Sequence, residues 1–191
     1  LHTHANLALS GKLLREIVRA DETWTIYSTS RLFFAFPLDN AFLGVLAVGA
    51  TTVLNTAWPD VDAVLAQVER HRPAVFFSVP SFFRRLLPLG DAGLAPFRAV
   101  RLCYTGGERL PESVFAQWKA ATGVPLFSCY GMSETFLNAL AEAPEHNRAG
   151  SCGRPLPGVD TRLITTEGAE APPGEAGVLW LRHPVMALRY N

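Results

Sequence analysis

A strong charge of either sign is missing from this chain. Its 17 lysine and arginine residues equal its 17 aspartate and glutamate residues, so the net charge at pH 7 is zero. Proteins that bind nucleic acids or anionic membranes gather basic residues in a patch that raises their net charge. The balance of charges therefore argues against nucleic acid and against a membrane surface as partners.

Long apolar runs are missing as well. No segment approaches the roughly 20 apolar residues that a membrane-spanning helix needs, and no signal peptide is visible in the first residues. The chain begins at Leu1, which is not a natural start. The question whether a leader precedes it therefore stays open. We expect no membrane partner.

Cysteine is scarce, and its spacing has no obvious purpose. The three cysteines, Cys103, Cys129 and Cys152, are odd in number and lack the short paired spacing of a zinc site. Disulfides persist mainly in oxidising compartments. We therefore expect three free thiols and a cytoplasmic location.

Short apolar segments alternate with segments of helical periodicity over most of the chain. We expect strands at 24–28, 51–54, 75–79, 99–103 and 124–128, and helices at 7–18, 40–48, 60–72, 80–87 and 111–122. Such alternation is typical of an α/β fold, a parallel sheet with helices on both faces.

The pattern changes toward the end of the chain. Residues 160–164 and 178–181 alternate polar and apolar side chains, and four prolines between 155 and 173 mark the transition. This pattern favours a small antiparallel β piece. We expect one unit over residues 1–148 and the start of a β-rich unit over 149–191.

Two glycine turns follow apolar runs. The first contains Gly106, Gly107, Glu108 and Arg109, and the second is the stretch Tyr130-Gly131-Met132-Ser133-Glu134-Thr135. Ligands of open α/β sheets sit beyond the carboxyl ends of the strands, so the two turns predict two walls of one pocket. An aromatic face, a hydroxyl and a carboxylate within five residues suit a nucleotide with Mg²⁺.

These turns resemble core motifs of the adenylate-forming superfamily, which includes acyl- and aryl-CoA synthetases and the adenylation domains of peptide synthetases. The family motifs are Tyr-Gly-x-Ser/Thr-Glu and Gly-Gly-Glu-x-Leu-Pro. Two further matches, Gly153–Gly158 and Gly174–Leu181, follow in family order. The resemblance covers nearly the whole chain and implies a flavodoxin-like subdomain with ATP, Mg²⁺ and coenzyme A as reactants or cofactors.

The resemblance assigns roles to the second turn. Tyr130 would stack on adenine, Gly131 would let the acyl-adenylate approach the backbone, Ser133 would reach the α-phosphate, and Glu134 would bind Mg²⁺. Ser133 and Glu134 are thus the candidate catalytic residues. A purely structural role also stays open, because a Ser-Glu pair often caps a helix.

The first turn would form the other side of the adenine slot through the backbone of Gly106, Gly107, Glu108 and Arg109. Alternatively, the two glycines simply permit a turn, and Glu108 caps a helix that starts at Pro111. Ser128 aligns with a polar position that contacts the adenine amino group.

The carboxylic acid pocket is expected to involve Phe36, Cys129 and Gly131. Residues 28–36 are similar to a segment of benzoate–CoA ligases in which an aromatic side chain lies against the bound aryl group. The chain departs from that group at Pro37 and Asp39, where glycine is usual. We expect Phe33, Phe34, Phe82 and Phe83 in the core.

The resemblance also implies that this is an internal piece of a large N-terminal domain. Family members carry a phosphate loop before a His-Thr-His-x-Asn stretch like that at residues 2–6, and a ribose-binding Asp and a catalytic Lys after a stretch like the last residues here. The implied parent is an ATP-dependent carboxylic acid–CoA ligase, for benzoate or a related aryl acid. We expect the isolated piece to be inactive and to self-associate.

Two other classes of function stay open. The parent could activate amino acids or fatty acids; Asp39 is the candidate partner for a substrate ammonium group. The chain could also be a non-catalytic, flavodoxin-like binding module, in which Tyr130 would have no stacking role.

Overall fold

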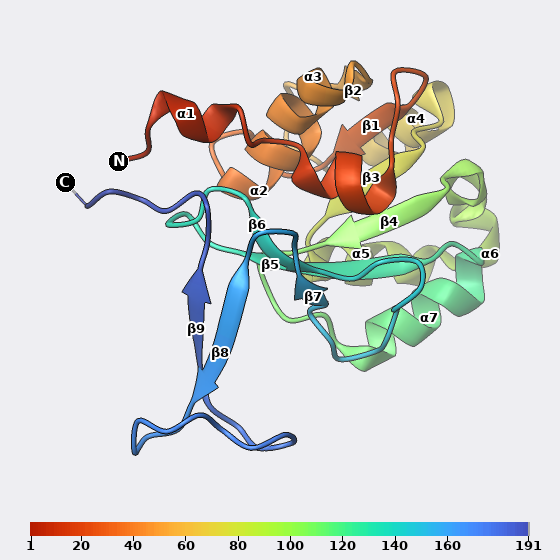
Figure 1. The fold of residues 1–191 in the computed structure, drawn as a ribbon. Helices are drawn as coiled ribbons and strands as arrows, with labels where there is room; N and C mark the ends of the chain where they lie inside the picture. Colours follow the sequence, from red (N-terminus) through yellow and green to blue (C-terminus); the bar gives the residue numbers. More distant parts are fainter. Residues whose placement is uncertain (191) are drawn as a thin grey trace.

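A seven-stranded sheet organises the computed structural model, which describes residues 1–190. Its strands run in the order β2-β1-β3-β4-β5-β6-β7 (Figure 1). The bounds are β1 Thr25–Ser28, β2 Thr51–Val53, β3 Val75–Ser78, β4 Leu102–Thr105, β5 Leu126–Gly131, β6 Asn138–Ala141 and β7 Arg154–Pro155. The first five strands are parallel, and β6 and β7 are antiparallel additions. The order 2-1-3-4-5 is that of flavodoxin, so the α/β fold class is confirmed.

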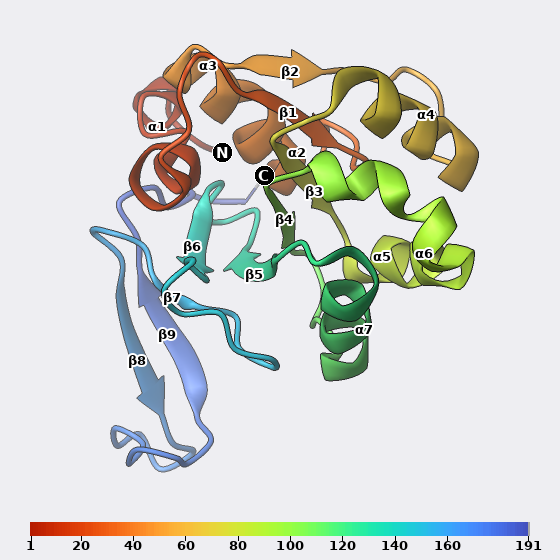
Figure 2. The ribbon, with the colours of Figure 1, turned by 90° about the vertical axis from the view of Figure 1, so that its right-hand side faces the viewer.

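Helices cover both faces of this sheet (Figure 2). One face carries α4 Val61–His71, α5 Pro80–Leu86, η3 Leu87–Leu89, α6 Gly90–Gly93, η4 Ala95–Ala99 and α7 Glu112–Thr122. The other carries η1 Leu13–Val18, α2 Ala35–Leu38, η2 Asp39–Leu43 and α3 Gly44–Val48, after the short α1 His4–Leu7. None of the helices in the described part of the chain is long and apolar enough to cross a bilayer.

Alternate residues of the strands divide into two cores. In β3, Phe76 packs with the helices of one face, and its neighbours Val75 and Phe77 pack with the other. The first core centres on Trp118 of α7, whose ring contacts Phe83 at a centroid distance of 4.8 Å. Buried side chains of this size stabilise a fold by about 1.5–3 kcal/mol each, which explains why apolar runs predicted the strands well.

The helix between β1 and β2 differs from the expectation. It begins at Ala35 rather than near residue 40, and its middle, η2, is a π-helix. Gly44 in this helix lies against Gly11, since a Cβ on Gly44 would be 2.8 Å from the Gly11 Cα. Gly11 has a φ of 81° and interrupts the helix expected over 7–18.

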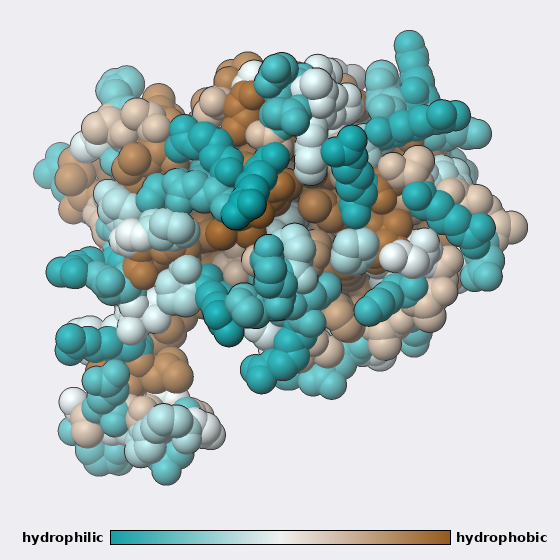
Figure 3. All heavy atoms as spheres, turned by 45° about the vertical axis from the view of Figure 1, so that its right-hand side comes forward, coloured by the Kyte–Doolittle hydropathy of each residue, from teal (hydrophilic) through white to brown (hydrophobic). Residues whose placement is uncertain are grey.

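A two-stranded antiparallel hairpin, β8 Asp160–Ile164 and β9 Val178–Arg182, projects from the body (Figure 1). It exposes Leu163, Val178 and Trp180, and brown apolar surface shows on it in Figure 3. The expected antiparallel piece is confirmed. The division at 148/149 stays a prediction, and β7, which lies beyond it, pairs with β6 of the large sheet.

Candidate active site

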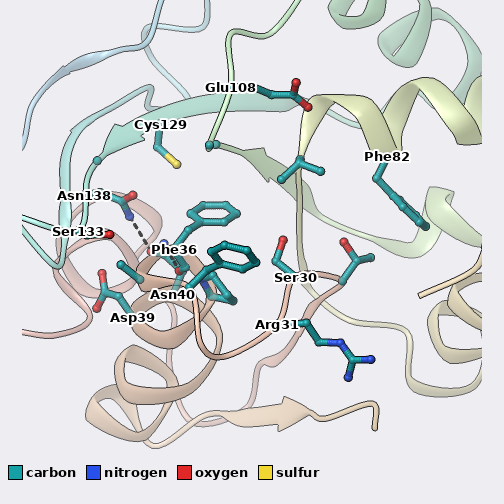
Figure 4. Close-up of a pocket in the computed structure, with 18 of the residues that line it drawn as sticks. Ser30, Arg31, Phe36, Asp39, Asn40, Phe82, Glu108, Cys129, Ser133 and Asn138 are labelled. Atoms are coloured by element: carbon teal, nitrogen blue, oxygen red, sulfur yellow. Dashed lines mark hydrogen bonds between the residues drawn. The ribbon is translucent and has the colours of Figure 1, made fainter. Parts of the chain in front are cut away.

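A cavity of about 650 Å³ opens beyond the carboxyl ends of the parallel strands (Figure 4). Segments that follow β1, β3, β4 and β5 supply its walls, as expected for ligand sites in α/β sheets. Seven of the residues predicted from the sequence line it: Phe36, Gly106, Gly107, Glu108, Cys129, Gly131 and Ser133. The two glycine turns therefore do form walls of one cavity.

Gly106 sits where three parts of the wall meet. A Cβ at this position would lie 3.1 Å from Cε2 of Phe36 and 3.2 Å from Sγ of Cys129. Both distances are shorter than normal van der Waals contact, so a side chain here would displace the aromatic ring. The absence of a side chain lets β4 and β5 approach the helix that carries Phe36. Gly107 follows with a φ of 87°, a conformation that glycine adopts without strain.

Glu108 links the first turn to the cavity's other side. Its carboxylate oxygen Oε1 accepts a hydrogen bond of 2.8 Å from the backbone N–H of Ser81, in the first turn of α5. The alternative that Glu108 caps the helix after Pro111 is therefore wrong; no side chain caps α7. A carboxylate satisfies free N–H groups at a helix start well, and the interaction holds the turn against α5. Arg109 is exposed and lies outside the cavity lining.

The Tyr130–Thr135 stretch ends β5 and enters a tight turn rather than a helix. Ser133 and Glu134 therefore cap no helix, which corrects that alternative. The Thr135 hydroxyl donates to the carbonyl oxygens of Met132 and Leu137 at 3.1 and 2.9 Å. A Cβ on Gly131 would lie 3.0 Å from the Leu137 oxygen, so glycine permits the close return of the chain.

Residues 2–6 brace this turn from outside. The Thr3 hydroxyl donates to Oδ1 of Asn6, which leaves the Asn6 amide N–H to bond Nδ1 of His2 at 3.0 Å. With Nδ1 accepting, the proton of a neutral His2 sits on Nε2, which bonds the Ser133 carbonyl at 2.7 Å. His2 thus orients the turn.

In the described residues, no group of three or more His, Cys, Asp or Glu side chains could hold a metal.

Glu134 faces outward from the turn. Its side chain accepts a hydrogen bond from the Tyr190 hydroxyl, and its carbonyl accepts one from the Ala187 N–H at 2.6 Å. The Tyr190 hydrogen bond lowers the pKa of the carboxyl group, so Glu134 is ionised at neutral pH. Glu134 is not part of the cavity lining. A carboxylate can hold Mg²⁺, which prefers oxygen ligands and completes its shell with phosphates and water.

Tyr130 and Ser128 do not line the cavity. Tyr130 is half-buried and packs against the core on one face of the sheet. Ser128 is buried, and its backbone N–H donates to Oε2 of Glu142 at 3.3 Å. Their contacts with adenine stay predictions.

The end of the cavity around Phe36 has an apolar wall and a polar wall. The Phe36 ring meets the Phe77 ring edge-to-face at 5.8 Å. Phe33 and Phe34 were expected in the core, but they are 74% and 57% exposed, and Phe34 lines the cavity. At the mouth, the Arg31 guanidinium lies 4.4 Å from the centroid of the Trp58 ring.

Three further polar residues line the cavity, of which the sequence analysis named only Asp39, as a candidate partner of an ammonium group. Asp39, Asn40 and Asn138 line it and are almost fully buried. Oδ1 of Asp39 accepts a 3.0 Å hydrogen bond from the Gly11 N–H, and burial raises the pKa of the carboxyl group to about 7. The signal available in the sequence was Asp39 itself, a charged residue in an otherwise apolar helix.

Cys129 also lies at this end. Its thiol donates to the Thr105 carbonyl oxygen at 3.4 Å, and burial raises the pKa of the thiol far above neutrality. Cys129 is therefore a neutral part of the wall. All three cysteines are free, as expected.

Comparison with known proteins gives the family. Residues 1–191 match the family described as AMP-binding enzyme. A 3-hydroxybenzoate–CoA/4-hydroxybenzoate–CoA ligase of Thauera aromatica is 34% identical over 95% of this chain and 35% of its own length. The chain thus spans about a third of that relative.

Solved structures share the fold closely. A benzoate–CoA ligase from Burkholderia xenovorans LB400 superposes with a TM-score of 0.91 at 33% identity, over 99% of this chain and 39% of that one. The anthranilate–CoA ligase AuaEII in complex with anthranoyl-AMP superposes with a TM-score of 0.90 at 29% sequence identity. The match covers 98% of this chain and 37% of that one. An O-succinylbenzoate–CoA synthetase from Bacillus subtilis with ATP and magnesium superposes with a TM-score of 0.80 at 25% sequence identity. The match covers 97% of this chain and 38% of that one.

Proposed function

Because this chain belongs to the family of AMP-binding enzymes, we propose that the complete protein carrying it is an ATP-dependent aryl acid–CoA ligase. The observation that supports an aryl acid best is the contact of Phe36 with Gly106 at the cavity wall. A flat ring can pack against the apolar wall that this aromatic side chain and the glycine backbone form together. Binding sites for small molecules are mostly apolar with few polar groups, as this one is.

The proposed reaction has two steps. A carboxylate oxygen of the acid attacks the α-phosphorus of ATP and forms the acyl-adenylate, and pyrophosphate leaves. The sulfur of coenzyme A then attacks the acyl carbon, the bond to AMP breaks, and the thiol proton passes to solvent. Catalysis of the first step rests on positioning and on neutralising phosphate charge, which Mg²⁺ supplies when bound.

Residue roles in this proposal follow the two turns. The backbone of Gly106–Arg109 and the face of Tyr130 hold adenine, with Ser128 as the polar partner of its amino group. Ser133 donates to the α-phosphate, and Glu134 binds the metal. Gly131 leaves room for the reacting groups, while Phe36 and Cys129 contact the acid. A cytoplasmic location is part of the same proposal.

The alternative of an amino acid substrate has one supporting observation. The carboxyl group of Asp39 is buried and lines the cavity, where it could pair with an ammonium group. The apolar surroundings of Phe34 and Phe36 favour an aryl acid over it.

Pyrophosphate release by the complete protein tests the proposal. Benzoate, hydroxybenzoates, medium-chain fatty acids and amino acids are supplied in turn, and kcat/KM is compared. We expect an aryl acid to be preferred. A clear preference for a fatty acid or an amino acid would contradict the assignment.

A further inference from the structure

One side of the acid cavity carries polar atoms that the fold itself leaves unused. Figure 4 shows Cys129, Asn138, Asn40 and Asp39 on this side, and Glu108, Phe82 and Arg31 on the other. Asp39 belongs to η2 and Asn138 to β6. The two elements meet through the hydrogen bond between Asn40 and Asn138, which are 98 residues apart in the sequence. Both side chains are buried.

The orientation of the Asn138 amide is fixed by a chain of hydrogen bonds. The Phe36 carbonyl can only accept, so Asn40 must turn its Nδ2 toward it, at 2.8 Å. Oδ1 of Asn40 therefore faces Asn138, which must donate through its own Nδ2, at 2.7 Å. Oδ1 of Asn138 is left over. None of the hydrogen bonds found in residues 1–190 uses it.

Asp39 presents a second unused acceptor. One carboxylate oxygen, Oδ1, accepts from the Gly11 N–H, while none of the hydrogen bonds found within the described residues uses Oδ2. At a pH above about 7 the carboxylate form prevails. Both left-over atoms then accept hydrogen bonds and neither donates. Neither atom is among the fully buried atoms that lack a partner, and both residues line the cavity, so a ligand in the cavity can donate to them.

We propose that Asp39 and Asn138 form a subsite for a hydrogen-bond donor, a hydroxyl or amino group, on the ring of the aryl acid. The inference rests on the proposed aryl acid activation and narrows its substrate class. Phe36 holds the ring, and the two acceptors select its substituent. A site built to bind a hydroxyl group discriminates strongly against an analogue that lacks one.

Steady-state kinetics of the complete protein at pH 8 test the subsite. At each ring position, kcat/KM for pyrophosphate release is compared between the hydroxybenzoate and the methylbenzoate, which has similar size but no donor. We expect a preference for the hydroxy acid of at least roughly tenfold at one position, about 1.4 kcal/mol. Equal values at every position would overturn the inference without any variant.

The variant Asp39→Asn sharpens the test. Its Oδ1 can still accept from the Gly11 N–H, while a donor replaces the free acceptor. We expect the preference for the hydroxybenzoate over the methylbenzoate to fall about tenfold. The fall should come from a lower kcat/KM for the hydroxybenzoate, while that for the methylbenzoate stays the same. The control Asp62→Asn, an exposed carboxylate of α4, should leave the preference unchanged.

Three results contradict the inference in distinguishable ways. An equal loss for both acids in Asp39→Asn would show that Asp39 only supports the fold. Preference for the methyl acid would show an apolar subsite. If no aryl acid releases pyrophosphate at all, the proposed function itself is wrong, and the subsite falls with it.

Discussion

At the scale of single residues, the proposed chemistry of this site depends on groups that the fold leaves accessible. Glu134 is the clearest case, because its carboxylate is ionised and sits in a turn that is braced on both sides. His2 holds the turn through the Ser133 carbonyl, and residues 187 and 190 hold Glu134. Such a brace keeps a weakly buried side chain in place, as a metal ligand requires.

Glu134→Gln in the complete protein tests the metal role. Glutamine keeps the shape and can still accept the Tyr190 hydrogen bond, but it removes the charge that faces Mg²⁺. We expect pyrophosphate release at limiting Mg²⁺ to fall at least roughly tenfold, with partial recovery at high Mg²⁺. Glu145→Gln, an exposed carboxylate elsewhere, is the control. Unchanged release in Glu134→Gln would leave Glu134 as a turn residue only.

At the scale of elements, the sequence predicted what local patterns determine. The buried run of β3 and the Asp60 cap of α4, whose Oδ1 accepts from the Ala63 N–H at 2.7 Å, were both found. The two glycine turns were placed correctly because strand ends and glycines are local signals.

Contacts between distant elements could not be predicted in this way. The bond from Ser81 to Glu108 joins residues 27 apart, and that from Asn138 to Asn40 joins residues 98 apart. No periodicity records such pairs. The π-helix η2 was missed as well. The helix packs closely against Gly11 directly after it, at Gly44, a contact that no local pattern predicts.

The close approach of Gly153 to β6 gives a test at this scale. A Cβ on Gly153 would lie 1.9 Å from the carbonyl carbon of Ala141, and its φ is 94°. Gly153→Ala therefore adds a clash to the strain of a left-handed conformation. We expect it to lower the free energy of unfolding by at least about 2 kcal/mol more than Gly168→Ala. Gly168 has a φ of 84° but nothing within 4 Å.

Urea unfolding of the chain, followed by tryptophan fluorescence, to which the buried Trp118 contributes, measures both losses. Equal losses in the two variants would mean that β7 does not pack against β6 as closely as described.

At the scale of the whole molecule, the distribution of apolar surface is the main feature. The hairpin β8–β9 exposes Val178 and Trp180, and the cavity lining exposes Phe34 and Trp58. With a net charge of zero, little electrostatic repulsion keeps copies of the chain apart. Exposed apolar patches of this kind favour association, which supports the expectation that the chain self-associates.

The chain by itself should be inactive and bind ATP weakly. It spans about a third of a relative's length, and by family resemblance the phosphate loop, the ribose-binding Asp and the catalytic Lys belong to other parts of the protein. Charge-assisted contacts to phosphate are the strong ones. Without them, adenine stacking leaves at best millimolar affinity, about −4 kcal/mol.

Calorimetry with ATP, in the presence and absence of an aryl acid, measures this affinity directly. A hydroxylamine trap for acyl-adenylate provides the second readout, and the complete protein is the positive control. The residues proposed to hold adenine, Gly106–Arg109 and Tyr130, are present in both samples, so we attribute any difference to the groups that hold phosphate and ribose. Micromolar ATP binding or trapped product from these 191 residues would place the decisive nucleotide contacts within this chain.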